Sequence, residues 1–423
     1  MDAHDYLWLD LEKVGVFELC RLLLCKQIGE RKFINSNDDK GLYGTFWHKV
    51  DQLSRESPDF SSVIGLTDTR LELDDQIRHE DPRYNSALAI MAAKTAYENE
   101  ARIKKIVQDY WKMDFIGFYN CSNAFETKPV ADKEKPTQAF MFSDKTGHHE
   151  LICVSFRGTS PLCADDWCTD LDLSWFHLKG IGRVHLGFLK ALGLQKSEEN
   201  YAWWPKDIKH NENITFAYYK TRQVLKENLE KNKDARFIVT GHSLGGALAV
   251  LFPTILALHD EHELLDRLEG VYTFGQPRVG DDEFCRFMED LLGVKRYFRF
   301  VYANDIVPRL PFDDTDFHYK HFGRCYYFNS LYKGQVLNEE PNKNYFSIKS
   351  IGPMYLNAIF EMVRSVILPY AYGRRYREGV LLLGLRIYGL IFPGISAHCP
   401  QDYVNITRLA SPDTFNAQKY DFY

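Results

Sequence analysis

The sequence lacks several features that would mark it as a member of a specialised class of protein. Its 423 residues contain 52 Lys and Arg against 58 Asp and Glu, so it has no basic excess that would attract nucleic acid. It has nine cysteines but no C-x-x-C pair, which argues against a zinc site and a disulfide framework. Its first five residues are acidic, whereas a secretory signal peptide starts with basic residues. We therefore expect a cytoplasmic protein with reduced thiols and no metal site.

Long uninterrupted apolar runs are also scarce. The two clearest stretches, residues 14–25 and 379–392, each contain charged residues. Both are shorter than the ~20 residues that a membrane-spanning helix needs, so a single-pass membrane protein is not expected. Two interpretations stay open for each stretch: a buried core helix, or a helix that lies in the plane of a lipid surface. Arg374, Arg375 and Arg377, just before the second stretch, would assist contact with lipid.

The order of the elements predicts an α/β protein. Residues 1–130 are expected to form a mostly helical N-terminal region, which is a candidate for lipid-surface contact. In residues 131–423, strands are expected to alternate with helices, which predicts a mostly parallel central sheet flanked by helices. From about 330 to 392 this alternation gives way to an aromatic and apolar insertion. The expected strands are 139–142, 150–156, 236–240, 270–275 and 296–302, and the expected helices are 87–97, 213–231, 244–259 and 281–292.

The hexapeptide Gly-His-Ser-Leu-Gly-Gly at 241–246 is the most informative motif. It follows an expected strand and opens an expected helix. A strand, a Gly-x-Ser-x-Gly turn and a helix are the parts of a nucleophile elbow, in which small residues flank an exposed serine hydroxyl. The alternative is a glycine turn between two core elements. The context favours Ser243 as a catalytic nucleophile.

A serine hydroxyl needs a histidine to take its proton and a carboxylate to orient that histidine. In α/β-hydrolases these residues follow in the order Ser, Asp, His. Asp305 lies just past an expected strand, and the alternative for it is a carboxylate that caps a loop. By position we favour His398, in a turn-like segment after the last apolar run, as the base. His318 and His321, in an expected strand at 317–322, are the fallback.

Acyl transfer also needs two N–H groups that hold the oxyanion. The elbow supplies the backbone N–H of Leu244. The second donor should come from the loop after an earlier strand, where Thr159 follows the strand expected at 150–156. An ordinary glycine turn is the alternative for this loop.

Together these motifs resemble the class 3, or fungal-type, lipase family. The resemblance is carried by residues 154–159, 166–171, 184–188, 241–246 and 273–279, and by Asn304 with Asp305. It implies an α/β-hydrolase fold, with Ser243, Asp305 and His398 as the catalytic triad and with Thr159 and Leu244 as oxyanion donors. It also implies that Asp170 supports the oxyanion residue, and that no metal or organic cofactor is required.

Over its whole length the chain resembles the plant oil-body triacylglycerol lipase type of this family. That resemblance implies hydrolysis of acylglycerol esters at the surface of lipid droplets in the cytoplasm. Two alternatives stay open: a phospholipase A1 or galactolipase on the same framework, and a catalytically silent protein that binds lipid droplets. In the simpler fungal pattern the lid that covers the site should follow Thr159, and the alternatives here are a lid built from the insertion or from the N-terminal region. The sequence leaves the oligomeric state open.

Overall fold

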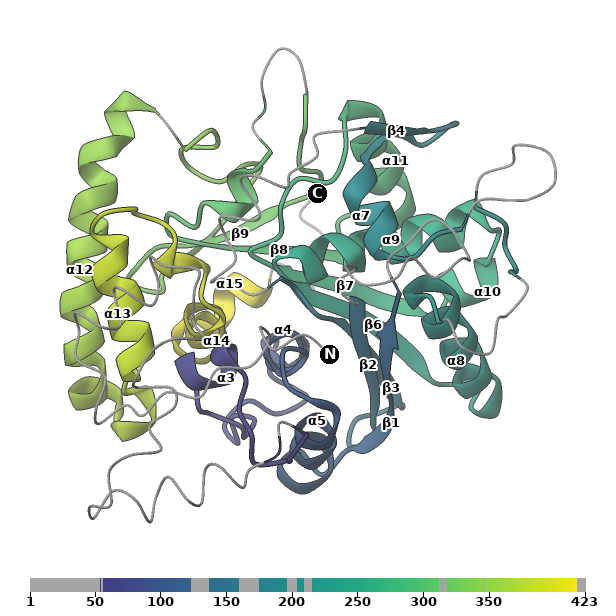
Figure 1. Ribbon diagram of the computed structural model, residues 1–423, viewed down its shortest axis with the longest axis horizontal. Helices are drawn as coiled ribbons and strands as arrows, with labels where there is room; N and C mark the ends of the chain where they lie inside the picture. Colours follow the sequence, from purple (N-terminus) through teal and green to yellow (C-terminus); the bar gives the residue numbers. More distant parts are fainter. Residues whose placement is uncertain are drawn as a thin grey trace.

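The computed structural model describes residues 54, 56–122, 137–159, 175–195, 204–208, 215–311, 313, 318–345 and 347–416. Within these residues, eight strands form one central sheet (Figure 1). Strands β3, β6, β7, β8 and β9 run parallel, and the pairs β1–β2, β2–β3 and β9–β10 are antiparallel. In sheet order the strands are β1 (Asp114–Cys121), β2 (Thr137–Asp144), β3 (Leu151–Phe156), β6 (Arg236–His242), β7 (Leu268–Phe274), β8 (Tyr297–Tyr302), β9 (Cys325–Phe328) and β10 (Gly334–Leu337).

Helices cover both faces of this sheet. Strand residues alternate between two cores, as the pleat of a strand requires. Ile152, Val154 and Phe156 belong to one core, and Leu151 and Cys153 belong to the other. The first core is closed by α7 (Leu186–Ala191), α8 (Ala217–Lys231), α9 (Leu244–Leu258) and α11 (Asp282–Leu292), and the second by α4 (Tyr84–Thr95) and α14 (Pro400–Leu409). The α/β-hydrolase fold expected from the sequence is confirmed.

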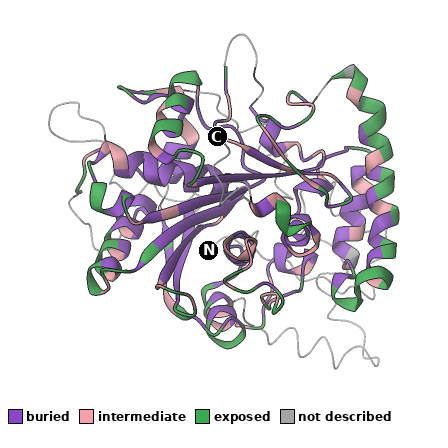
Figure 2. Ribbon diagram, turned by 180° about the vertical axis from the view of Figure 1, so that it is seen from behind, coloured by how far each residue is buried: buried purple, intermediate pink, exposed green. Residues whose placement is uncertain are grey.

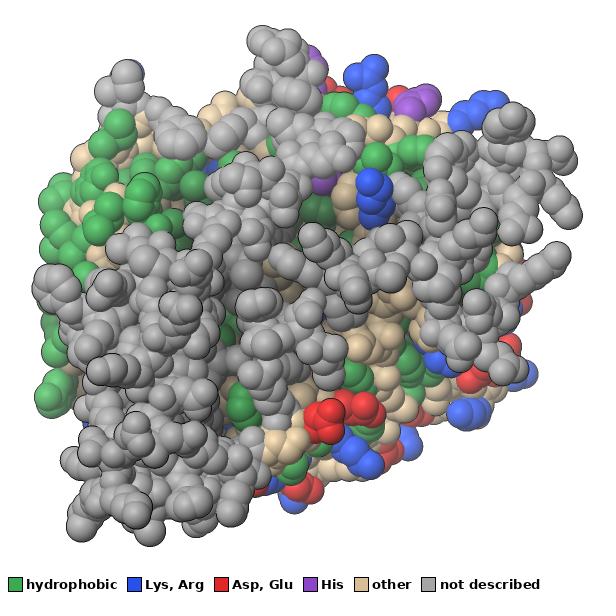
Figure 3. Space-filling view, in the orientation of Figure 1, with side chains coloured by type: hydrophobic (Ala, Val, Ile, Leu, Met, Phe, Trp, Pro, Cys, Tyr) green, Lys and Arg blue, Asp and Glu red, His purple; other side chains and the backbone are tan. Residues whose placement is uncertain are grey.

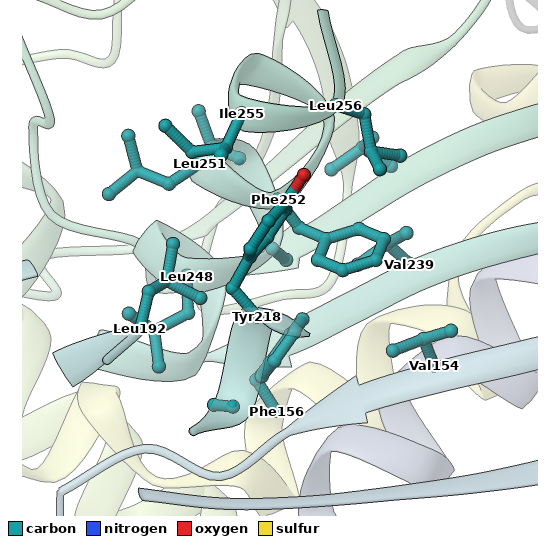
Figure 4. Packing of buried hydrophobic residues seen from close by; sticks show 14 of the residues in the cluster. Val154, Phe156, Leu192, Tyr218, Val239, Leu248, Leu251, Phe252, Ile255 and Leu256 are labelled. Carbon is teal, nitrogen blue, oxygen red and sulfur yellow. The ribbon is translucent and has the colours of Figure 1, made fainter. Parts of the chain in front are cut away.

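Helix α9 is held rigidly against the sheet. Its Phe252 ring lies 5.8 Å from the ring of Phe156 and 5.8 Å from that of Tyr218, measured between centroids (Figure 4). All three side chains are buried. Burying such a ring stabilises a fold by roughly 1.5–3 kcal/mol, so this packing fixes the helix whose first residue follows Ser243.

The N-terminal region joins the same sheet. Its described helices are α3 (Val63–Thr67), α4, α5 (Glu100–Lys105) and the π-helix Ile106–Tyr110. A strand then follows where the sequence predicted helix, because β1 is an edge strand whose half-buried side chains give only a weak pattern. It pairs with β2 across the boundary that we predicted at residue 130. The stretch 14–25 lies outside the described residues, and the division into two regions stays a prediction.

The insertion at about 330–392 contains two helices that lie side by side, α12 (Ile348–Tyr372) and α13 (Val380–Gly389), joined by a short 3-10 turn (Arg374–Tyr376). In the stretch 379–392, Leu381, Leu382 and Leu385 are buried, which supports the core interpretation. Ile391 and Phe392, which follow α13, are exposed.

The strand expected at 317–322 is not formed by the residues described there. Lys320 makes only an isolated bridge to Gly280, and β9 begins at Cys325. The remaining elements are β4 (Trp175–Leu178), β5 (Gly182–His185), α10 (His262–Leu265), α15 (Pro412–Asn416) and the 3-10 turns Val307–Arg309 and Ser396–His398.

Candidate active site

Ser243 lies at the sharp turn between β6 and α9. Its backbone has φ 62° and ψ −131°, a conformation that residues with a side chain rarely adopt. A Cβ atom at Gly241 would lie 2.1 Å from the carbonyl of Gly245, and one at Gly245 would lie 2.2 Å from the carbonyl oxygen of Phe156. Only glycine fits at either position, which is the physical reason for the Gly-x-Ser-x-Gly spacing.

Ser243, His398 and Asp305 form one hydrogen-bonded row. The Oγ of Ser243 lies 2.9 Å from Nε2 of His398. The Nδ1 of His398 lies 2.8 Å from Oδ2 and 3.0 Å from Oδ1 of Asp305. Because Nδ1 faces a carboxylate, it carries the proton and donates to Asp305, which leaves Nε2 free to accept from the serine hydroxyl.

Two loops at the carboxyl ends of the strands bring these partners together. Asp305 follows β8 in a turn closed by its own N–H, which donates to the carbonyl of Tyr302 at 3.0 Å. His398 ends the 3-10 turn that precedes α14. The backbone of Gly275, with φ 59°, lies in close contact with the side chains of Asp305 and His398. A Cβ atom at this position would lie 2.8 Å from Oδ2 of Asp305 and 3.0 Å from Nδ1 of His398.

The two fallback histidines lie elsewhere. His321 is buried and its Nε2 lies 2.7 Å from the carbonyl oxygen of Pro308. Burial lowers the pKa of His321 well below the ordinary value, so its ring is neutral and donates to that carbonyl. His318 is exposed. The structure thus places His398, rather than either of these, against Ser243.

The loop after β3 runs beside the serine. A Cβ atom at Gly158 would lie 2.4 Å from the carbonyl oxygen of His242 and 3.1 Å from Cβ of Ser243, so this loop passes in close contact with the elbow. Thr159 follows at the end of the described part of the loop. Leu244 is the first residue of α9, where backbone N–H groups lack helical partners. Asp170 lies outside the described residues, and the oxyanion roles stay predictions.

Sequence reasoning missed a second partner of the carboxylate. The hydroxyl of Tyr403, on α14, donates to Oδ2 of Asp305 at 2.5 Å. The backbone N–H of Val307 donates to Oδ1 at 2.9 Å. Burial, and then the charge of Asp305, raise the pKa of Tyr403 well above its usual value, so the phenol keeps the proton that it donates. With His398, these donors fix the orientation of the carboxylate from three directions.

A histidine inside the elbow holds the loop that carries His398. The Nε2 of His242 lies 2.8 Å from the carbonyl oxygen of His398, and the hydroxyl of Tyr97 lies 2.9 Å from Nδ1 of His242. Burial lowers the pKa of His242 well below the ordinary value, so the ring is neutral. It donates from Nε2 to the carbonyl and accepts at Nδ1 from the tyrosine. No motif predicted these contacts, because they join residues 145 and 156 positions apart.

The assembled groups are those of nucleophilic acyl transfer: a serine hydroxyl, an imidazole in contact with it, and a carboxylate behind the imidazole. Among the residues that the structure describes, no three His, Cys, Asp or Glu side chains are grouped so that they could hold a metal ion.

Known structures resemble the chain in part. The lipase of Rhizopus microsporus var. chinensis is 23% identical, with a TM-score of 0.43 over 64% of this chain and 84% of its own. The triacylglyceride lipase of Rhizomucor miehei is 22% identical, with a TM-score of 0.42 over 59% of this chain and 81% of its own.

Sequence similarity extends over almost the whole chain. The family model described as lipase (class 3) matches residues 153–315. The triacylglycerol lipase OBL1 of Arabidopsis thaliana is 44% identical over an alignment 454 positions long, which covers 97% of this chain and 86% of the relative. The protein of the same name from Nicotiana tabacum is 42% identical over an alignment 446 positions long, which covers 89% of this chain and 77% of the relative. The predicted resemblance to the plant oil-body type is confirmed, and the chain belongs to the class 3 lipase family.

Proposed function

We propose that this lipase hydrolyses the ester bonds of triacylglycerols with Ser243 as nucleophile, His398 as base and Asp305 as the orienting carboxylate. The observation that carries the proposal is the 2.9 Å contact between Oγ of Ser243 and Nε2 of His398, with the Asp305 carboxylate 2.8 Å from the other ring nitrogen. The curated relatives named triacylglycerol lipase, similar over most of the chain, support this substrate class.

The reaction proceeds in two acyl transfers. Nε2 of His398 takes the hydroxyl proton as Oγ of Ser243 attacks the ester carbonyl, and the N–H groups of Leu244 and Thr159 hold the resulting oxyanion. Protonated His398 then gives its proton to the leaving glycerol oxygen, which leaves an acyl-serine. Water repeats the sequence and releases the fatty acid. Asp305 stays ionised and stabilises the imidazolium that forms in each half.

The location proposed for this reaction is the surface of lipid droplets in the cytoplasm. Ser243 is 1% exposed and His398 is 5% exposed, so a long-chain ester reaches them only when neighbouring residues move aside. Contact with a lipid surface would supply both the substrate and an apolar environment for that movement.

Two alternatives remain, and they differ in a measurable way. A phospholipase A1 or galactolipase would use the same triad on a different head group. A silent lipid-droplet binding protein would have no reason to keep a serine, an imidazole and a carboxylate within hydrogen-bond distance of one another. The assembled row therefore favours an enzyme.

The first prediction concerns Ser243 itself. The full-length protein is incubated with emulsified triacylglycerol, phospholipid vesicles and galactolipid micelles, and released fatty acid is measured. We expect the highest rate on triacylglycerol and a loss on the order of 10⁶-fold for Ser243→Ala, since serine and histidine act as one unit. Faster hydrolysis of phospholipid or galactolipid would favour the alternative substrates. Activity that survives in Ser243→Ala would overturn the proposed mechanism.

A further inference from the structure

Helix α12 differs from an ordinary surface helix, because its exposed side is apolar while charged residues lie on its buried side. Of the helices in the described part of the chain, it alone is long and apolar enough to cross a membrane (Lys349–Tyr372), with an 18-residue window of mean hydropathy 1.2 that is 33% buried. Its inward side carries the apolar residues Met354, Ala358 and Leu368. It also carries Glu361, Arg364 and Ser365, which are 2%, 6% and 3% exposed. A surface helix usually turns such residues to water and its apolar residues to the core.

The outward residues of α12 are almost all apolar, and they recur every three or four positions, so they form one continuous stripe. In Figure 2 this side of α12 is exposed and the side toward α13 is buried, and in Figure 3 hydrophobic side chains gather along the same edge of the molecule. We call the apolar face the following residues, which are between 39% and 89% exposed: Ile351, Tyr355, Leu356, Ile359, Phe360, Val363, Val366, Ile367, Tyr370 and Tyr372 on α12, with Ile391 and Phe392 after α13.

A buried ionic cluster anchors the inward side of the helix. Arg386 on α13 lies 3.3 Å from Glu361, 2.9 Å from Glu378 and 2.8 Å from Asp402 on α14. Arg364 lies 2.9 Å from the other oxygen of Asp402. Moving α12 away would separate Glu361 from Arg386 and Arg364 from Asp402, and breaking buried ion pairs costs far more than losing a surface contact. The helix therefore stays packed while its apolar face stays uncovered by the described residues.

The exposed charges at the two ends of α12 are of one sign. Between residues 347 and 377, the exposed charged side chains are Lys349 at the start of α12 and Arg374, Arg375 and Arg377 just after its end. Basic side chains at the rim of an apolar face suit the anionic head groups of a lipid layer, which attract them near the surface. They would repel the same rim on a second copy of this chain.

The apolar face also adjoins the catalytic loop. The hydroxyl of Tyr355 donates to the carbonyl of Ile391 at 3.3 Å. This hydrogen bond joins the part of the apolar face on α12 to the part that follows α13. Phe392 lies six positions before His398. On the inner side, Arg364 donates to the hydroxyl of Tyr302 at 2.5 Å, three residues before Asp305.

We propose that the apolar face docks the protein onto the phospholipid-coated surface of a lipid droplet, with α12 lying in the plane of that surface. The proposal rests on the proposed function, for which it names the docking element. Lipid acyl chains cover the aliphatic residues, and the terminal tyrosines and the basic rim lie at the level of the head groups. A helix that crossed a bilayer would have to expose Glu361 and Arg364 to hydrocarbon, so α12 lies on the surface rather than across it.

The test compares two valines that are equally exposed. Val363 on the apolar face and Val294 after α11 are each 47% exposed. Val363→Gln, the triple change Leu356→Gln, Val363→Gln and Val366→Gln, and the control Val294→Gln are made in the full chain. Each protein is mixed with triolein emulsions coated with phosphatidylcholine and phosphatidylserine, and the floating fraction is measured. A water-soluble short-chain ester and thermal unfolding report separately on catalysis and folding.

We expect the triple variant to bind the emulsion at least ~30-fold more weakly, since three aliphatic side chains no longer leave water on docking. The Val363→Gln protein should bind the emulsion measurably more weakly than the unchanged protein, while the Val294→Gln protein should float to the same extent as the unchanged protein. Hydrolysis of the soluble ester and the melting temperature should stay as they are in all variants. Arg374→Gln with Arg377→Gln should weaken binding to emulsions containing phosphatidylserine more than to those of phosphatidylcholine alone.

Full flotation of the triple variant would overturn the proposal. So would flotation that depends on residues 1–25 alone, or a protein dimer that the triple variant converts to a monomer without changing flotation. If the unchanged protein floats through the apolar face but hydrolyses no ester, the docking surface stands and the proposed lipase chemistry fails. The two claims are thus separated by the same set of proteins.

Discussion

The carboxylate of Asp305 receives donors from His398, Tyr403 and Val307. Two of these lie on the segment 398–403, so one segment carries both the proposed base and one support of the carboxylate. Chain order and motif spacing indicated Ser243 and Asp305 as candidates, because an elbow and a strand-end carboxylate are local signals, and the structure places both against His398. Nothing local marks Tyr403, because its contact with Asp305 spans 98 positions.

Tyr403→Phe removes one donor to Asp305 without changing the shape of the core. A hydrogen bond to a charged group is worth about 1.5–3 kcal/mol, so we expect kcat to fall roughly 10–100-fold while KM stays nearly unchanged. Steady-state kinetics on a water-soluble ester give both constants. Tyr219→Phe, which removes a hydroxyl bonded to the carbonyl of Pro205 at 3.0 Å, is the control. A Tyr403→Phe enzyme with unchanged kcat would mean that the carboxylate needs no such support.

At the scale of elements, β3, β6, β7, β8, α4, α9 and α11 could be predicted because each carries a regular apolar pattern or a motif at its end. Strand β1 and helix α12 are among the elements that were not predicted. Strand β1 lies at the edge of the sheet, where half-burial weakens the alternation. Helix α12 contains Pro353 and Pro369, and its apolar residues lie on both its exposed and its buried side, so the usual pattern of a single buried stripe is absent.

Arg386 holds helix α12 in place through its contact with Glu361. Arg386→Met would leave the carboxylates of Glu361, Glu378 and Asp402 buried without their shared cation. Removing one partner from a buried ion cluster typically costs about 3–5 kcal/mol, and we expect that loss in the free energy of unfolding measured in urea. Arg286→Met, at an exposed position on α11, should change it by less than about 0.5 kcal/mol. Equal stabilities for the two variants would contradict the anchoring role of the cluster.

For the whole molecule, buried histidines link stability to pH. Burial lowers the pKa of both His242 and His321 well below the ordinary value of 6.5. The unfolded chain then binds protons more readily than the folded one, so their contribution to stability is full above about pH 6.5 and declines as the pH falls below it.

His321→Gln keeps a donor for the Pro308 carbonyl but does not titrate. Each such histidine steepens the decline of stability below pH 6.5 by at most about 1.4 kcal/mol per pH unit. We expect the variant to show a shallower decline between about pH 6.5 and 4.5 in urea unfolding. His262→Gln, at an exposed position, should keep the original slope. A His321→Gln protein with the original slope would show that this histidine is not protonated on unfolding.

For the molecule as a whole, the proposed function requires that His398 activates Ser243. Labelling with a fluorophosphonate probe, followed by peptide mass spectrometry, measures that activation directly. The account predicts modification at Ser243 alone, and loss of labelling in His398→Ala. Labelling at another serine, or labelling of Ser243 that survives His398→Ala, would contradict it.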